Sequence, residues 1–167
     1  AHFYDLNGDE IEKETTEIKW DAEAAEKAGY EHFMIKEIHE QPKAVSDTLN
    51  SVVKDGAIDL SEVGLSEEEI KEISQIYIVA CGSAYHVGVA AQYVMEDLAR
   101  IPVRVELASE FRYRNPILDP KGLVIIISQS GETADSLAAL RESKKQGVKT
   151  LGIVNVIGSS TAREADK

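Results

Sequence analysis

Cysteine, long apolar runs and basic residues are all scarce in this 167-residue chain, and each scarcity excludes a class of protein. A single cysteine cannot build a disulfide framework and fits a reducing compartment. No apolar stretch approaches the roughly 20 residues of a membrane helix, and the first residues do not read as a signal peptide. We therefore expect a cytoplasmic protein of about one domain's size that contacts no membrane.

Acidic residues outnumber basic ones by 30 to 18, which gives a formal net charge of −12 at pH 7. Such a field repels the phosphates of nucleic acids, so the sequence predicts no nucleic-acid partner. A phosphorylated sugar would have to be captured by short-range hydrogen bonds and dipoles instead. The histidines and the cysteine show no metal-ligand spacing, so the sequence implies neither a metal nor a cofactor.

The first part of the chain carries a hairpin signal followed by helical patterns. Asn7-Gly8 between apolar-bearing arms predicts a β-hairpin within residues 1–20. From Asp21 the apolar spacing predicts a helix that ends near Pro42, and then a second helix through residues 45–53 that stops at Asp55-Gly56. We expect residues 21–75 to form a helical lead-in without site chemistry.

A short acidic helix closes this lead-in. Ser66 with Glu69 three residues later is a capping box, in which each side chain bonds the backbone N–H of the other residue. The helix is therefore expected to open at Ser66.

Residues 76–167 alternate strand and helix patterns, which is typical of an α/β fold with a doubly wound parallel sheet. Residues 123–127 are five consecutive branched aliphatics, too short for a helix and too apolar for a half-exposed strand, so they predict a central strand. The other expected elements are strands at 76–80, 103–107 and 150–154, a helix at 85–98, and a helix through Leu137 and Leu140 that ends at 144–147.

The residues after the central strand predict an anion site. Ser128, Ser130 and Thr133 bring three hydroxyls to the start of the next helix, where free backbone N–H groups and the positive end of the helix dipole also point. A structural turn capped by Ser130 is the simpler alternative, but it needs one hydroxyl and gives Gly131 no role. A nucleotide P-loop would need a lysine after the glycine, and a hydrolase nucleophile elbow would need glycine two residues after the serine. Both requirements fail here.

A second loop, Cys81-Gly82-Ser83, also joins a strand to a helix and is expected at the same carboxyl edge of the sheet. Gly82 would let the backbone approach a ligand, and Ser83 offers a hydroxyl. Cys81 could be a nucleophile at a helix start, but a small buried residue that closes the strand is the favoured interpretation. His86 could act as a base, although a packed or solvated histidine is commoner there.

Charged residues follow the strand at 103–107, and we expect them to extend it. Glu110, Arg112 and Arg114 alternate with Phe111 and Tyr113. Two arginines near the ligand edge could hold a phosphate, but salt bridges or a subunit contact are the favoured interpretation.

The loop Ser128-Gln129-Ser130-Gly131-Glu132-Thr133 resembles the phosphate loop of the sugar isomerase (SIS) family, and three more motifs resemble the glucosamine-6-phosphate synthases within it. These motifs occur in the family's order: His32-Phe33-Met34-Ile35-Lys36-Glu37-Ile38-His39-Glu40-Gln41-Pro42, Ala80-Cys81-Gly82-Ser83-Ala84-Tyr85-His86 and Ala108-Ser109-Glu110-Phe111-Arg112-Tyr113-Arg114.

The resemblance implies a flavodoxin-like SIS sheet, with a fifth strand expected after Asp166. It implies that residues 1–20 are the remnant of a glutaminase domain and that residues 76–167 are an incomplete first SIS domain. It also implies that the complete enzyme converts fructose-6-phosphate and glutamine to glucosamine-6-phosphate and glutamate. In the family the acid and base come from a second SIS domain and a C-terminal tail, so no catalytic residue and no activity are expected in this chain alone.

The role that the resemblance implies for the chain is to anchor the C6 phosphate of fructose-6-phosphate or glucosamine-6-phosphate. Ser128, Gln129, Ser130, Thr133 and Ser83 would bind the phosphate, with secondary positions at Gly82, Ala84 and Gly131. Serine is common in the family where this chain has Ala84, which puts one polar contact in doubt. A homo-oligomer, most simply a dimer, is expected. A non-catalytic phosphosugar sensor is the alternative function, but such regulators usually carry a DNA-binding head, and no basic or helix-turn-helix-like segment of that kind precedes Ile76.

Overall fold

The computed structural model describes residues 2–13 and 26–167, and the chain divides into two units, Ala1–Ile58 and Asp59–Lys167. The helix start predicted at Asp21 and the end of the 1–20 segment lie outside the described residues. The predicted domain boundaries after residues 20 and 75 therefore stay predictions.

The first unit opens with the predicted hairpin. Strand β1 (Phe3–Tyr4) pairs antiparallel with β2 (Glu10–Ile11). The Asp5 carboxylate shapes the turn, because its Oδ1 accepts hydrogen bonds from the backbone N–H groups of Asn7 at 2.8 Å and Asp9 at 3.0 Å. The hairpin signal at Asn7-Gly8 is thus confirmed.

Helix α1 (Phe33–Val52) corrects the prediction of two helices separated at Pro42. The helix runs through Pro42, because the apolar positions Ile38, Val45 and Leu49 stay in phase on both sides of it. Within the described residues α1 begins at Phe33, and residues 26–32 before it are not helical. Ala28 and Gly29 both have positive φ, in a turn closed by the bond from Tyr30 N–H to Lys27 O.

Asp55-Gly56 is a hairpin turn, not the helix stop predicted from the sequence. It joins β3 (Val53–Lys54) to β4 (Ala57–Ile58), which pair antiparallel. Both turn residues have positive φ, +53° and +78°, as a two-residue hairpin turn of this kind requires.

The second unit is the predicted α/β fold with a four-stranded parallel sheet. The sheet order is β6-β5-β7-β8. Its elements in chain order are the 3-10 helix η1 (Ser61–Val63), α2 (Glu67–Glu72), β5 (Gln75–Ala80), α3 (Gly82–Ala99), β6 (Val103–Leu107), α4 (Ala108–Tyr113), β7 (Gly122–Ser128), α5 (Ala134–Lys145), β8 (Lys149–Val154) and α6 (Ser160–Glu164). The capping box that opens α2 is present as predicted, with both reciprocal bonds formed.

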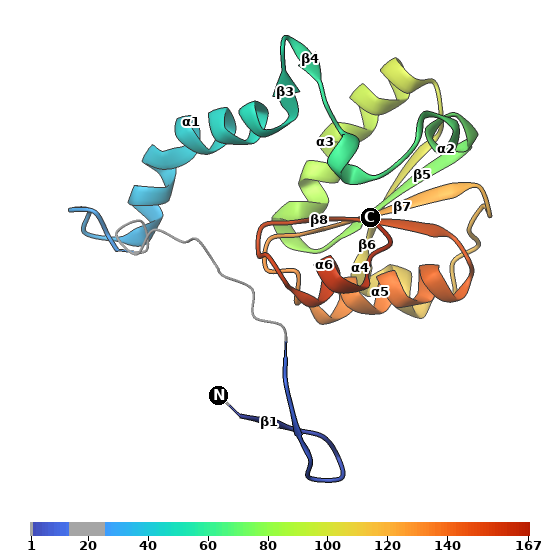
Figure 1. The fold of residues 1–167 in the computed structure, drawn as a ribbon. Coiled ribbons are helices and arrows are strands. Elements are labelled where there is room, and N and C mark those ends of the chain that lie inside the picture. The colour runs from blue at the N-terminus through green and yellow to red at the C-terminus, as the bar shows by residue number, and fades with distance from the viewer. Residues whose placement is uncertain (1, 14–25) are drawn as a thin grey trace. The chain divides into compact units, whose positions relative to one another are not determined.

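Helices cover both faces of this sheet (Figure 1), so alternate residues of each strand enter different cores. Tyr77 and Val79 of β5 pack with α4 and α5, whereas Ile76 and Ile78 face α3. Gly88 lets α3 lie close to the sheet, because a Cβ there would stand 2.8 Å from the Ile78 side chain. Such double coverage explains why β7 is apolar at nearly every position.

Residues 108–113 form helix α4, which overturns the prediction that they extend the preceding strand. The alternation of charged and apolar residues suggested a strand. The decisive spacing is instead helical, since Ala108 and Phe111 are three residues apart and both fully buried.

The last residues lie against the outer edge of β8. Lys167 donates its N–H to Thr150 O at 3.2 Å and accepts from Gly152 N–H at 2.9 Å, which is the pattern of a parallel pair. The fifth strand expected after Asp166 stays a prediction.

Candidate functional site

The two loops singled out from the sequence lie next to each other at the carboxyl edge of the sheet. Strands β5 and β7 are hydrogen-bonded neighbours in parallel, and Ala80 pairs with Ile127 near their carboxyl ends. The chain goes from β5 to β6 on one side and then crosses to β7 on the other, so the strand order reverses between β5 and β7. Ligands of open α/β sheets bind at such a point.

Within the loop of residues 128–133, two serine hydroxyls hold the loop's own backbone. Ser128, which is only 4 % exposed, accepts a hydrogen bond from Gly131 N–H at 3.0 Å, and its Oγ lies 3.3 Å from Thr133 Oγ1. Ser130 Oγ accepts from Glu132 N–H at 3.2 Å. Gln129 is exposed at the tip, whereas Ser130 and Thr133 are half-buried.

The start of α5 adds donors to this loop. Thr133 occupies the N-cap position but forms no side-chain cap, and the first intrahelical bond runs from Leu137 N–H to Thr133 O. The N–H groups of the three residues between them have no carbonyl acceptor within the helix. The positive end of the helix dipole lies at the same place, so the arrangement favours an anion.

An acid in the first turn of α5 is offset by a cation from α4. Arg112 Nη1 donates to Asp135 Oδ1 at 2.6 Å, and both side chains are about one-third exposed. The bond to Asp135 raises the pKa of Arg112 above its ordinary value. Arg114 forms a bidentate pair with Glu106. Both arginines therefore form intrachain ion pairs, which is the interpretation that the sequence favoured.

The loop of residues 81–84 is more open than its neighbour. Gly82 begins α3 with φ +57°, a conformation that favours glycine. Ser83 is exposed, Ala84 is half-buried, and no hydrogen bond joins the Ser83 hydroxyl to any residue in the described ranges. Cys81 packs against the buried cluster beside α4 and α5, as expected for a small residue that closes a strand.

His86 is exposed and packs edge to face on Tyr85, with ring centroids 5.3 Å apart. Nothing in this geometry distinguishes it as a base.

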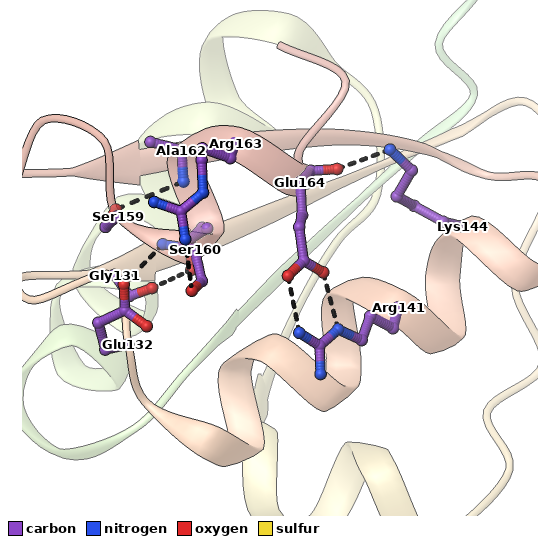
Figure 2. A network of polar contacts seen from close by, with 10 residues as sticks. Gly131, Glu132, Arg141, Lys144, Ser159, Ser160, Ala162, Arg163 and Glu164 are labelled. Atoms are coloured by element: carbon purple, nitrogen blue, oxygen red, sulfur yellow. Dashed lines mark hydrogen bonds and ion pairs between the residues drawn. The ribbon is translucent and has the colours of Figure 1, made fainter. Parts of the chain in front are cut away.

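Sequence reasoning missed a third segment, residues 155–161, which follows β8 and holds the 128–133 loop. Thr161 donates to Gly131 O from both its N–H, at 3.0 Å, and its Oγ1, at 2.8 Å. Ser160 N–H donates to Glu132 Oε1 at 2.7 Å, a contact drawn in Figure 2. The available signal was Ser159 at the cap position of a short helix after a strand, since its hydroxyl accepts from Ala162 N–H.

No three His, Cys, Asp or Glu side chains within residues 2–13 and 26–167 gather closely enough to hold a metal ion. No helix in these ranges is long and apolar enough to cross a membrane.

This arrangement of strands and loops matches a known domain. The model of the SIS domain matches residues 69–167, which include both loops and all four strands of the sheet. The chain belongs to the SIS domain family.

Curated relatives of this SIS chain are isomerizing glutamine–fructose-6-phosphate aminotransferases. The enzyme from Caldanaerobacter subterraneus subsp. tengcongensis is 57% identical over 168 residues, covering 100% of this chain and 28% of the relative. The Mycobacterium leprae enzyme is 54% identical over 163 residues, covering 98% of this chain and 26% of the relative. The chain thus spans little more than a quarter of the length of these relatives.

Two solved structures are similar to this chain. The C-terminal domain of glucosamine-fructose-6-phosphate aminotransferase from Francisella tularensis matches with a TM-score of 0.79 at 47% identity, over 84% of this chain and 40% of that one. Glucosamine-6-phosphate deaminase from Thermotoga maritima matches with a TM-score of 0.54 at 29% identity, over 59% of this chain and 32% of that one.

Proposed function

We propose that this chain is the phosphate-anchoring part of an enzyme that makes glucosamine-6-phosphate from fructose-6-phosphate and glutamine. The relatives carry the name of that activity, and the match runs through the whole chain. The observation that carries the proposal is the 128–133 loop, which lies at the reversal of strand order and begins a helix whose first N–H groups have no acceptor within the helix.

In this proposal the C6 phosphate lies against the start of α5. The hydroxyls of Ser130 and Thr133 and the N–H groups of the first turn of α5 bind its oxygens, and Ser128 and Gln129 complete the loop. Ser83, on the neighbouring loop, reaches the same ligand from β5. Charge-assisted hydrogen bonds of this kind are the strong ones, so a few suffice against the acidic net charge.

The binding energy at the phosphate serves to orient the distant reacting carbons. Proton transfer at C1 and C2 needs an acid and a base, and the described residues of the 81–84 and 128–133 loops supply no such pair. We assign catalysis to parts of the complete enzyme outside this chain. A cytoplasmic location and self-association as a dimer belong to the same proposal.

Calorimetry tests the proposal with fructose-6-phosphate and with unphosphorylated fructose. We expect only the phosphorylated sugar to bind. The double variant Ser130→Ala/Thr133→Ala should weaken that binding by about 1–3 kcal/mol, because charge-assisted hydrogen bonds are lost.

Ser66→Ala is the matched control, because it also removes a hydroxyl at a helix start. This helix, α2, leads into the amino end of β5, whereas the proposed site lies at the carboxyl end. That variant should lower stability through loss of the cap and leave fructose-6-phosphate affinity unchanged. Equal binding of fructose and its phosphate, or full affinity in the double variant, would refute the proposal.

A further inference from the structure

The segment that follows β8, Asn155 to Thr161, contacts the 128–133 loop at three successive places. Asn155 N–H donates to Gln129 O at 3.2 Å, and Thr161 donates twice to Gly131 O. Ser160 N–H donates to the Glu132 carboxylate at 2.7 Å. Figure 2 shows the part of this network around Gly131, Glu132 and the start of α6.

The 155–161 segment and the 128–133 loop are closely packed against each other. Thr161 is fully buried and Ser159 is 3 % exposed. Gly131 has φ +67°, and a Cβ placed on it would stand 2.1 Å from Ser159 Oγ. Glycine is therefore required for two independent reasons, its backbone conformation and the closeness of Ser159.

These bonds decide which way the peptide groups of the loop face. In a trans peptide, the carbonyl of one residue and the N–H of the next point in opposite directions, and the described residues contain no cis peptide. The carbonyls of Gln129 and Gly131 point to the 155–161 segment, so the N–H groups of Ser130 and Glu132 face away from it, and that of Glu132 also donates to Ser130 Oγ within the loop. An anion is attracted by N–H groups and repelled by carbonyl oxygens, so this orientation sets the polarity of the loop.

We propose that the 155–161 segment positions the 128–133 loop for an anion, and that Thr161 of the segment and Glu132 of the loop are the positioning residues. Thr161 fixes the peptide between Gly131 and Glu132, since reversing that peptide would break both bonds from Thr161. Glu132 ties the end of the loop to Ser160 and keeps its own carboxylate on that side. This inference rests on the proposed phosphate site.

The Glu132 carboxylate matters because an unrestrained negative charge would repel a phosphate. Its bond from Ser160 N–H lowers the pKa of Glu132, and Arg163, which donates to Ser160 Oγ at 3.2 Å, lowers it further. Glu164 acts in the opposite direction. The carboxylate is therefore ionised at neutral pH and bound to the α6 side of the contact.

Thr161→Val tests the proposal, because it keeps the volume and the backbone N–H and removes only the hydroxyl bond to Gly131. We expect fructose-6-phosphate affinity of the full 167-residue chain, measured by calorimetry, to fall about three- to tenfold. Thr161→Ser restores the hydroxyl and should restore the affinity.

The matched control is Arg141→Gln. It breaks the bidentate bond between Arg141 of α5 and Glu164 of α6, in which both donor–acceptor distances are 2.7 Å. This bond also holds α6 in place, but it does not involve the 128–133 loop. This variant should bind fructose-6-phosphate like the wild type even where its thermal midpoint falls as far as that of Thr161→Val.

A second pair of variants serves if Thr161→Val does not fold. Glu132 is exposed, and both Glu132→Gln and Glu132→Ala remove its charge, but only glutamine can still accept from Ser160 N–H. Affinity should therefore be about two- to fivefold lower for alanine than for glutamine.

The outcomes separate the two proposals. Wild-type affinity in Thr161→Val, equal affinity in the two Glu132 variants, or losses that simply follow thermal stability in every variant would overturn the positioning role and leave the phosphate site standing. Absence of fructose-6-phosphate binding by the wild type would overturn the proposed function and the positioning role together.

Discussion

The two loops at the carboxyl edge have the same place in the fold but are built differently. Each follows a central strand, begins a helix and contains a glycine with positive φ. The 128–133 loop is tied by its own hydroxyls and by the 155–161 segment, whereas the 81–84 loop presents an exposed serine with no such bond among the described residues.

This difference separates two ways of presenting a hydroxyl to a ligand. A loop whose peptide groups are fixed beforehand loses little freedom when an anion binds, and its donors are already aimed. An open helix start contributes a donor that must be ordered at binding. We therefore expect removal of a hydroxyl from the 128–133 loop to affect both stability and affinity, and removal of the exposed Ser83 hydroxyl from the 81–84 loop to affect affinity alone.

Replacing each glycine by alanine gives the largest contrast. Both glycines have positive φ, +67° at Gly131 and +57° at Gly82, so alanine costs about 1 kcal/mol at either position from backbone strain. At Gly131 the new Cβ also meets Ser159, whereas at Gly82 it meets nothing within 4 Å. Gly131→Ala should therefore lower the free energy of unfolding by about 3 kcal/mol or more.

Urea unfolding measures the difference in free energy of unfolding between Gly131→Ala and Gly82→Ala. The two m values should equal that of the wild type, so that the midpoints report stability alone. Equal destabilisation at the two glycines would show that the contact with Ser159 does not constrain the loop.

Removing one serine hydroxyl from each loop gives a smaller contrast. Ser128→Ala leaves the Gly131 N–H unpaired in a buried place and should lower the free energy of unfolding by about 1–3 kcal/mol. Ser83→Ala removes an exposed hydroxyl and should change stability by less than about 0.5 kcal/mol. Thermal melts of the two variants measure this difference. A Ser128→Ala variant as stable as the wild type would show that the bond from Gly131 N–H to Ser128 does not stabilise the loop.

The sheet was predictable from the sequence because each strand has a local signal. The apolar run at 123–127 predicts a strand that is covered on both faces of the sheet. The observed strand β7 (Gly122–Ser128) adds one residue at each end. Strand β6 begins and ends at the predicted residues. Helix α4 was not predictable in this way, because its charged and apolar residues alternate, and only the burial of Phe111 against α5 selects the helix.

The hydroxyls of the candidate site were also visible in the sequence, but the long-range bonds that fix the 128–133 loop were not. Thr161 lies 30 residues after Gly131, and Ser160 lies 28 residues after Glu132. No local pattern joins such positions, since they meet only when β8 pairs with β7 and brings the next segment beside the loop. The same holds for Arg112 and Asp135, which lie 23 residues apart.

Acid titration gives the smallest contrast between the loops, because only the 128–133 loop carries a carboxylate. The bond from Ser160 N–H holds the pKa of Glu132 below its usual 4.5. A carboxyl group with a lowered folded-state pKa stabilises the fold above its unfolded value, and that contribution is lost as the pH falls through the folded value. The stability difference between wild type and Glu132→Gln should therefore be constant from pH 7 to about 5 and shrink below about pH 4.5.

Urea midpoints between pH 7 and pH 3 measure this difference, with Ser83→Ala as the control, whose difference from wild type should not change with pH. The effect is small because glutamine still accepts the Ser160 N–H and Glu132 is exposed to solvent, which screens its charge. A difference that persists unchanged to pH 3 would mean that the ionised carboxylate does not strengthen the contact with Ser160. The contact between the 155–161 segment and the 128–133 loop would then depend on Thr161 and Asn155 alone. The 128–133 and 81–84 loops would differ in hydrogen bonding but not in their response to acid.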